Sequence, residues 1–203
     1  MRNLLFIFFC SFNFLISQND PIAEKIVADV LKKINEANTI KVKFTLIQKN
    51  TKEYGTLELK GNKFRLDFMG IKQLSDSKNI YTIIDSNQEV IVSKIDEDDN
   101  SLKPSNLFNF FKNGYHYKNL ITNNNANNTV IKLIPIENSK KENELLLKID
   151  YDKKEIIEIS EVNNSNSLVV KINSISFNSK LNNENFTFNK LHYSNYYIES
   201  VEL

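Results

Sequence analysis

Cysteine, glycine and proline are scarce in this sequence, and each shortage excludes something. A single cysteine, Cys10, rules out an intramolecular disulfide. With 4 glycines and 3 prolines, most turns must use other residues, and the abundant asparagines can supply them. An excess of charge of one sign is also lacking, because 26 basic and 25 acidic residues leave a net charge of +1. This balance argues against a nucleic-acid-binding protein, which needs a basic face to neutralise phosphates.

The apolar content is that of a folded protein. Of the 203 residues, 41% are hydrophobic, and 14 Phe with 8 Tyr are enough for a core. At this length we expect one domain. The first seventeen residues resemble a signal peptide, because Arg2 precedes the apolar run Leu4–Ile16, which is too short to span a bilayer. The sequence therefore predicts a signal peptide at 1–17, export, and one domain at 18–203.

A lipid-anchored precursor is the alternative interpretation of this leader, because Cys10 lies within it. The residue before that cysteine is Phe9, where a lipid-attachment motif has a small residue. If the leader is cleaved after Ser17, Cys10 is removed, and the mature protein has neither a disulfide nor a thiol nucleophile.

One amphipathic helix is predicted at the start of the mature chain. Asp20 and Pro21 form a helix-start signature, a capping carboxylate followed by proline at the first helical position. Apolar residues then recur at intervals of three and four across Ile22–Ala37, which indicates one apolar helical face.

After the helix the apolar period changes to two, which is typical of strands with one apolar and one wet face. Gly61-Asn62 predicts a two-residue hairpin turn between two such strands. The predicted strands are Ile40–Leu46, Leu57–Lys60, Lys63–Phe68, Gln73–Ser75, Ile80–Ile84, Glu89–Lys94, Tyr115–Ile121, Val130–Ile136, Leu145–Tyr151, Glu155–Val162, Leu168–Phe177 and Tyr196–Leu203.

A short apolar helix is predicted at Ser105–Lys112, after Pro104 and before Asn113-Gly114. The predicted fold is therefore mainly β, of the α+β class. It is one large antiparallel sheet, curled into an incomplete half-barrel, with two or three helices covering its apolar concave face.

Several segments resemble the LolA family of periplasmic lipoprotein carriers, in the family's order. Thr39–Gln48 is similar to its first alternating strand, and Gly55–Lys60 to its G-x-L-x-x-K motif. Leu74–Tyr81 is similar to its V-S-D-G-K-x-x-W motif, the most specific of these. Further similarities lie in Phe64–Asp67, Pro104–Phe108 and Phe186–Phe188. In proteobacterial members an arginine that governs cargo release follows the G-x-L-x-x-K strand, whereas Gly61 stands there in this chain.

The resemblance implies a non-enzymatic, monomeric periplasmic chaperone, without a cofactor. It would bind the acyl chains of outer-membrane lipoproteins and carry them between the membranes. The implied partners are acylated lipoproteins, an inner-membrane lipoprotein-releasing ABC transporter and an outer-membrane acceptor. A lipid- or lipoprotein-sensing regulatory module on the same fold is the alternative, and a lipid-binding hydrolase is a third, which lacks a recognisable nucleophile arrangement.

The expected binding site is apolar throughout. We expect the cleft to be lined by Ile40, Val42, Phe44, Leu46, Leu57, Leu59, Phe64, Leu66 and Phe68, and covered by a lid of Ile22, Ile26, Val30, Phe108 and Phe111. An ordinary packed core would show the same periodicity, so the periodicity alone does not establish a ligand cavity.

No catalytic or metal-binding motif stands out. The two histidines, His116 and His192, have no second ligand at metal-binding spacing. The acidic run Asp96–Asp99 lacks the residue order of a calcium loop. We expect neither a catalytic nor a metal site.

Overall fold

The computed structural model describes residues 20–49, 51–95, 110–120, 127–137, 139, 143–162 and 168–201. The predicted signal peptide, the acidic run Asp96–Asp99 and Phe108 lie outside these residues. The described elements, in chain order, are α1 (Pro21–Asn35), β1 (Thr39–Gln48), β2 (Thr51–Lys60), β3 (Lys63–Phe68), β4 (Ile71–Ser75), β5 (Asn79–Ile84), η1 (Asp85–Asn87), β6 (Glu89–Lys94), β7 (Tyr115–Leu120), β8 (Asn128–Pro135), β9 (Leu145–Asp150), β10 (Glu155–Glu161), β11 (Leu168–Phe177), η3 (Asn183–Phe186), η4 (Lys190–Tyr193) and β12 (Tyr197–Val201).

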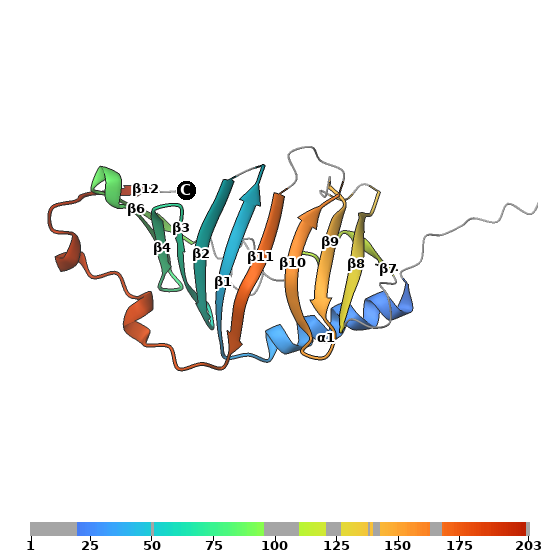
Figure 1. Ribbon diagram of the computed structural model, residues 1–203. Helices are drawn as coiled ribbons and strands as arrows, with labels where there is room; N and C mark the ends of the chain where they lie inside the picture. Colours follow the sequence, from blue (N-terminus) through green and yellow to red (C-terminus); the bar gives the residue numbers. More distant parts are fainter. Residues whose placement is uncertain are drawn as a thin grey trace, which may run out of the picture.

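All described strands belong to one 12-stranded sheet (Figure 1). Its order is β12-β6-β5-β4-β3-β2-β1-β11-β10-β9-β8-β7, and β12 and β7 are not neighbours, so the sheet does not close into a barrel. Every pairing is antiparallel except that of β12 with β6, which is parallel. The two halves of the sheet join where β1 pairs with β11. The predicted large, unclosed and mostly antiparallel sheet is confirmed.

The predicted helix start is confirmed at α1. The Asp20 carboxylate accepts hydrogen bonds from the backbone N–H groups of Ile22 and Ala23, at 2.9 and 3.3 Å. It also accepts one from Asn119 at 3.2 Å, which ties the helix start to β7. The helix crosses one face of the sheet over its β7–β10 half (Figure 1). Its buried residues are Ala23, Ile26, Val27, Val30, Leu31 and Ile34.

We call the face of the sheet under α1 the helix face and the opposite one the outer face. Alternating residues of β1–β3 lie on the helix face and share one core with α1, among them Ile40, Val42 and Phe64. Of the two or three helices expected, the described residues contain one α-helix, α1. The second expected helix, Ser105–Lys112, lies largely outside the described residues, and its described end, 110–112, forms a turn. Within that turn Phe111 is fully buried.

A second apolar cluster lies on the outer face of β4–β6, so the expectation of one wet face is wrong for these strands. Leu74, Ile83 and Val90 form its buried centre. The chain between β11 and β12 covers them, and the stacked rings of Phe188 and Tyr193 pack on this cluster. Figure 1 shows this C-terminal segment leaving β11 and passing outside β1–β4 before it reaches β12. Strands apolar on both faces need a cover on each side, and alternation in the sequence does not indicate that cover.

Candidate functional site

The helix face of β1–β3 opens gradually along the strands. At one end, the paired residues Ile40, Leu59 and Phe64 are all buried, with at most 6% of their surface exposed. In the next row, Val42 is buried, whereas Leu57 and Leu66 are half-buried.

The row that contains Phe44, the last one that β3 and β4 share with β1 and β2, is more accessible. Phe44 and Phe68 are half-buried, and Ile71 is 39% exposed. The two phenylalanine rings contact each other, with centroids 5.4 Å apart. The Phe44 ring lies against Gly55, which pairs with Phe44 on one side and with Phe68 on the other. Apolar side chains are therefore progressively exposed toward this end of the sheet, which we call the open row (Phe44, Gly55, Phe68 and Ile71).

A narrow apolar groove continues from the open row beneath the C-terminal half of α1. Its floor comes from β10 and β11, and Ile172 of that floor pairs directly with Phe44. The apolar lining is Val30, Ile34, Ile156, Ile159, Ile172, Ile175 and Phe177. This lining and the open row together form one apolar surface, and from here on the name apolar groove refers to both.

Charged side chains at the rim of the groove connect α1 to the residues just before β10 and at its start. Lys33 donates to Glu155 at 2.7 Å and to the backbone carbonyl of Lys153 at 2.8 Å. Its ammonium also lies 4.6 Å from the centre of the Phe177 ring. A second ion pair joins Asp29 to Lys154 at 3.2 Å. Such partly exposed pairs contribute at most about 1 kcal/mol each, so they position the helix without locking it.

The structure brings the nine predicted lining residues to one face. Ile40, Val42, Leu59 and Phe64 are buried there, whereas Phe44, Leu46, Leu57, Leu66 and Phe68 are half-buried. Of the predicted lid, Ile26 and Val30 point into the core, and Phe111 is buried as well. Ile22 is 62% exposed, so it does not belong to the buried helix face. It lies in the first turn of α1, beyond the apolar stripe that reaches the sheet.

Sequence reasoning missed the contribution of β10 and β11. Ile159, Ile172, Ile175 and Phe177 line the groove, although their strands were predicted. The alternation of Ile175 and Phe177 was the available signal. It could not be used because the pairing of β1 with β11 joins segments more than one hundred residues apart, which local patterns do not reveal.

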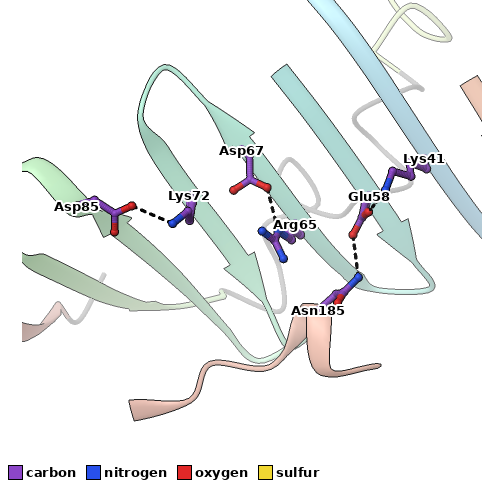
Figure 2. Close-up of polar contacts among 7 residues, drawn as sticks. All are labelled: Lys41, Glu58, Arg65, Asp67, Lys72, Asp85 and Asn185. Carbon is purple, nitrogen blue, oxygen red and sulfur yellow. Dashed lines mark hydrogen bonds and ion pairs between the residues drawn. The ribbon is translucent and has the colours of Figure 1, made fainter. Parts of the chain in front are cut away.

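The outer face of β1–β3 is polar, and a series of ion pairs runs across it to Lys72 on β4 (Figure 2). Lys41 pairs with the buried Glu58 at 2.6 Å, and Arg65 with Asp67 at 3.0 Å. Lys72 pairs with Asp85 at 2.8 Å. The hydrogen bond from Lys72 is the main reason why the pKa of Asp85 lies below its ordinary value, and the same bond raises the pKa of Lys72.

Within the described ranges, no group of three or more His, Cys, Asp or Glu side chains could hold a metal ion. His116 lies on β7 and His192 on η4. None of the helices in the described part of the chain has the length and apolarity to cross a membrane.

No protein-family model matches this chain. No curated protein matches it either. Among solved structures, it is similar to an uncharacterized conserved protein from Thermus thermophilus, with a TM-score of 0.57 and 10% identity over 90% of this chain and 99% of that one. This likeness shows a shared fold.

Two further matches have lower scores. One is a chain in the Pseudomonas aeruginosa MucA/MucB complex, with a TM-score of 0.49 and 10% identity over 83% of this chain. This chain spans 62% of that protein's length. The other is a LolA superfamily protein from Nitrosomonas europaea, with a TM-score of 0.38 and 13% identity over 82% of this chain and 97% of that one. The evidence for the open half-barrel expected from the sequence is the strand order of the unclosed sheet.

Proposed function

We propose that this protein is a periplasmic carrier that binds the acyl chains of lipoproteins in the apolar groove. The observation that carries the proposal is the graded burial of the helix face. Both phenylalanines of the Phe44–Phe68 row remain partly accessible, whereas the Ile40 row is buried, and contiguous accessible apolar surface is typical of a binding site. The sequence resemblance to the lipoprotein carriers supports the same conclusion.

The energetics of α1 suit a carrier that must also release its cargo. Exposing a sixteen-carbon chain to water costs roughly 12 kcal/mol, at about 0.8 kcal/mol for each methylene. Lifting α1 would expose five large aliphatic side chains, at roughly 10 kcal/mol in total. The two costs are similar. An acyl chain could therefore replace the helix on the sheet, and the helix could return when an acceptor takes the chain.

The proposal includes the cellular route. The leader at 1–17 would direct export, and the single domain at 18–203 would act as a soluble monomer without enzymatic activity. An inner-membrane lipoprotein-releasing ABC transporter would supply the acylated lipoprotein, and an outer-membrane acceptor would receive it. With Gly61 in place of the family's arginine, cargo release would depend on other contacts, and the rim pairs of Lys33 and Asp29 are suited to this role.

A release assay tests the proposal. Spheroplasts of the host that make one acylated lipoprotein, or its unacylated control, are incubated with the purified exported protein. A soluble one-to-one complex with the acylated form alone is expected. If a folded protein releases nothing although the host's own transporter is active, the carrier function is wrong. Binding of free acyl chains without release would instead point to a lipid-sensing module on the same fold.

A further inference from the structure

A polar cleft lies on the outer face, on the side of the sheet opposite the apolar groove. It is enclosed between β3–β4 and the C-terminal segment that runs through η3 and η4. Figure 1 shows the course of this segment, and Figure 2 shows Arg65 and Lys72 on their strands. Its volume is about 170 Å³, and it is open to solvent on one side. Arg65 and Lys72 project into it from the sheet, and Glu184, Asn189, His192 and Tyr193 line it from the segment.

Arg65 presents unused hydrogen-bond donors to this cleft. Its Nε donates to Asp67 at 3.0 Å, which is its one hydrogen bond among the described residues. The two terminal nitrogens of the guanidinium therefore have no protein partner in the described part of the chain. Asp67 holds the planar group from one side and leaves its remaining N–H groups available. A fork of this kind matches the paired oxygens of a carboxylate or phosphate.

Lys72 adds a second cation beside it. Lys72 lies directly across from Asp67 in the β3–β4 pairing, on the same face as Arg65. Its ammonium donates to Asp85, and the Tyr196 hydroxyl donates to the other oxygen of that carboxylate at 3.1 Å. One of the three ammonium protons is thus used in the described contacts. The aspartates fix the positions of both cations at the wall of the cleft.

Composition makes the position of Arg65 informative. The chain has 26 basic residues, of which Arg2 and Arg65 are the only arginines. Lysine serves every other described ion pair. A surface ion pair with Asp67 does not require a guanidinium, since lysine would form it equally well. A two-pronged hydrogen bond to a pair of anionic oxygens is made by a guanidinium and not by an ammonium, which acts as a point charge.

We propose that this outer-face cleft binds a small anionic group, a carboxylate or a phosphate, through the guanidinium fork of Arg65 with Lys72 beside it. Three carboxylates surround the site. Asp67 pairs with Arg65 through Oδ2, whereas its Oδ1 is buried without a hydrogen-bond partner among the described residues. Asp85 pairs with Lys72, and Glu184 accepts a hydrogen bond from Asn182 at 3.0 Å. Binding of the anion therefore depends on directed hydrogen bonds from Arg65 and Lys72. The negative charge of Glu184 lowers the affinity for the anion. The site is separate from the apolar groove and does not depend on the proposed carrier function.

The two arginines make the test specific. In a nitrogen-15 NMR spectrum, the arginine Nε–H signal that disappears in Arg65→Lys belongs to Arg65. Inorganic phosphate and acetate, each added up to about 50 mM at constant ionic strength, should shift this signal to saturation. The Arg65→Lys variant keeps the charge and should bind about tenfold more weakly. Because this variant lacks the Arg65 signal, its binding is measured from the backbone signals of residues that line the cleft. Glu184→Gln should bind roughly threefold more tightly, because one repelling charge is removed.

The source of the anionic group is decided with vesicles. Phosphatidylglycerol vesicles and phosphatidylcholine vesicles are compared for cosedimentation with the protein, and Lys118→Gln, an exposed change on the distant strand β7, is the control. Binding to phosphatidylglycerol that is lost in Arg65→Lys but not in Lys118→Gln identifies a lipid headgroup. Binding to phosphate or acetate alone identifies a free anion. The proposal is overturned if neither probe shifts the Arg65 signal and the vesicles do not bind, or if Arg65→Lys binds as the wild type does.

Discussion

The ring of Phe44 lies over the backbone of Gly55, its cross-strand partner in β2. A Cβ atom at position 55 would overlap the ring, so this glycine is required by the close approach of an aromatic side chain. An aromatic ring that covers a glycine on a neighbouring strand compensates for the missing side chain. This pair forms the centre of the open row, and it links a motif found in the sequence to the proposed binding surface.

Gly55→Ala should destabilise the protein by about 1–3 kcal/mol, because the added methyl group forces the Phe44 ring to move. Chemical denaturation measures the change. The double variant Gly55→Ala/Phe44→Leu provides the control, since the smaller leucine leaves room for the methyl group. It should recover part of the loss relative to Phe44→Leu alone. Equal losses in both backgrounds would show that the contact does not determine the cost.

Phe44→Glu should abolish acyl-chain binding and lower stability by about 2 kcal/mol, because it places a charge among apolar side chains. Displacement of a fluorescent fatty acid measures binding at a temperature where the variant is folded. Tyr54→Glu is the matched control: Tyr54 is 71% exposed on the neighbouring strand and pairs with Thr45, which points to the outer face. A folded Phe44→Glu protein that binds and releases cargo normally would remove Phe44 from the site.

Lys33→Ala should cost about 1 kcal/mol, because the pair with Glu155 is partly exposed and screened by solvent. Its larger expected effect is on binding, since a less firmly held α1 should lift more easily from the groove. Acyl-probe association should therefore become faster, as stopped-flow fluorescence would measure. The reversed pair Lys33→Glu/Glu155→Lys should return the rate part of the way to that of the wild type, since a carboxylate at position 33 cannot donate to the Lys153 carbonyl or contact Phe177 as a cation. If the rate responds to neither change, the rim pairs do not control access.

Phe188→Ala should destabilise the protein by about 2 kcal/mol and leave acyl binding unchanged. Its ring is stacked between Tyr81, at a centroid distance of 4.6 Å, and Tyr193, at 5.2 Å. These contacts lie on the outer face, so the change removes packing from the cluster around Leu74 without touching the groove. Thermal unfolding and fatty-acid displacement measure the two effects separately. A loss of acyl binding in the folded variant would contradict the separation of the two faces.

Stability should decrease in acid, in part because of Asp76. Partial burial raises the pKa of its carboxyl, but hydrogen bonds from the backbone of Asn79 and Lys78 and from the Tyr81 hydroxyl outweigh that effect. The pKa therefore lies below its ordinary value of 3.8. The folded state thus favours the carboxylate, and its contribution is present above about pH 4 and is lost as the pH falls through the folded pKa.

Urea denaturation between pH 6 and about pH 2.5 tests this assignment. Asp76→Asn should be less stable than the wild type at pH 6 and should lose less stability on acidification. Tyr81→Phe, which removes one of the three hydrogen bonds, should show an intermediate dependence. Parallel pH curves for the wild type and Asp76→Asn would show that this carboxylate does not contribute to the acid response.

Short-range patterns in the sequence were enough to predict much of the local structure. Asp20 and Pro21 set the start of α1, and Gly61-Asn62 set the turn between β2 and β3. The alternation of apolar residues in β1–β3 placed Phe44 and its neighbours on one face. These features depend on backbone preferences and on side-chain period, which operate over a few residues and can be recognised without knowing the partner.

The contacts between distant segments could not be predicted in this way and are known from the folded chain. The pairing of β1 with β11 brought Ile172 beside Phe44 and extended the groove to residues that local patterns had not linked to it. The parallel pairing of β12 with β6 drew the C-terminal segment across the outer face, which covered Leu74 and enclosed the cleft of Arg65. Many strand neighbours satisfy the same alternating pattern. The choice among them depends on burying both faces of the sheet at once, which is a property of the whole chain.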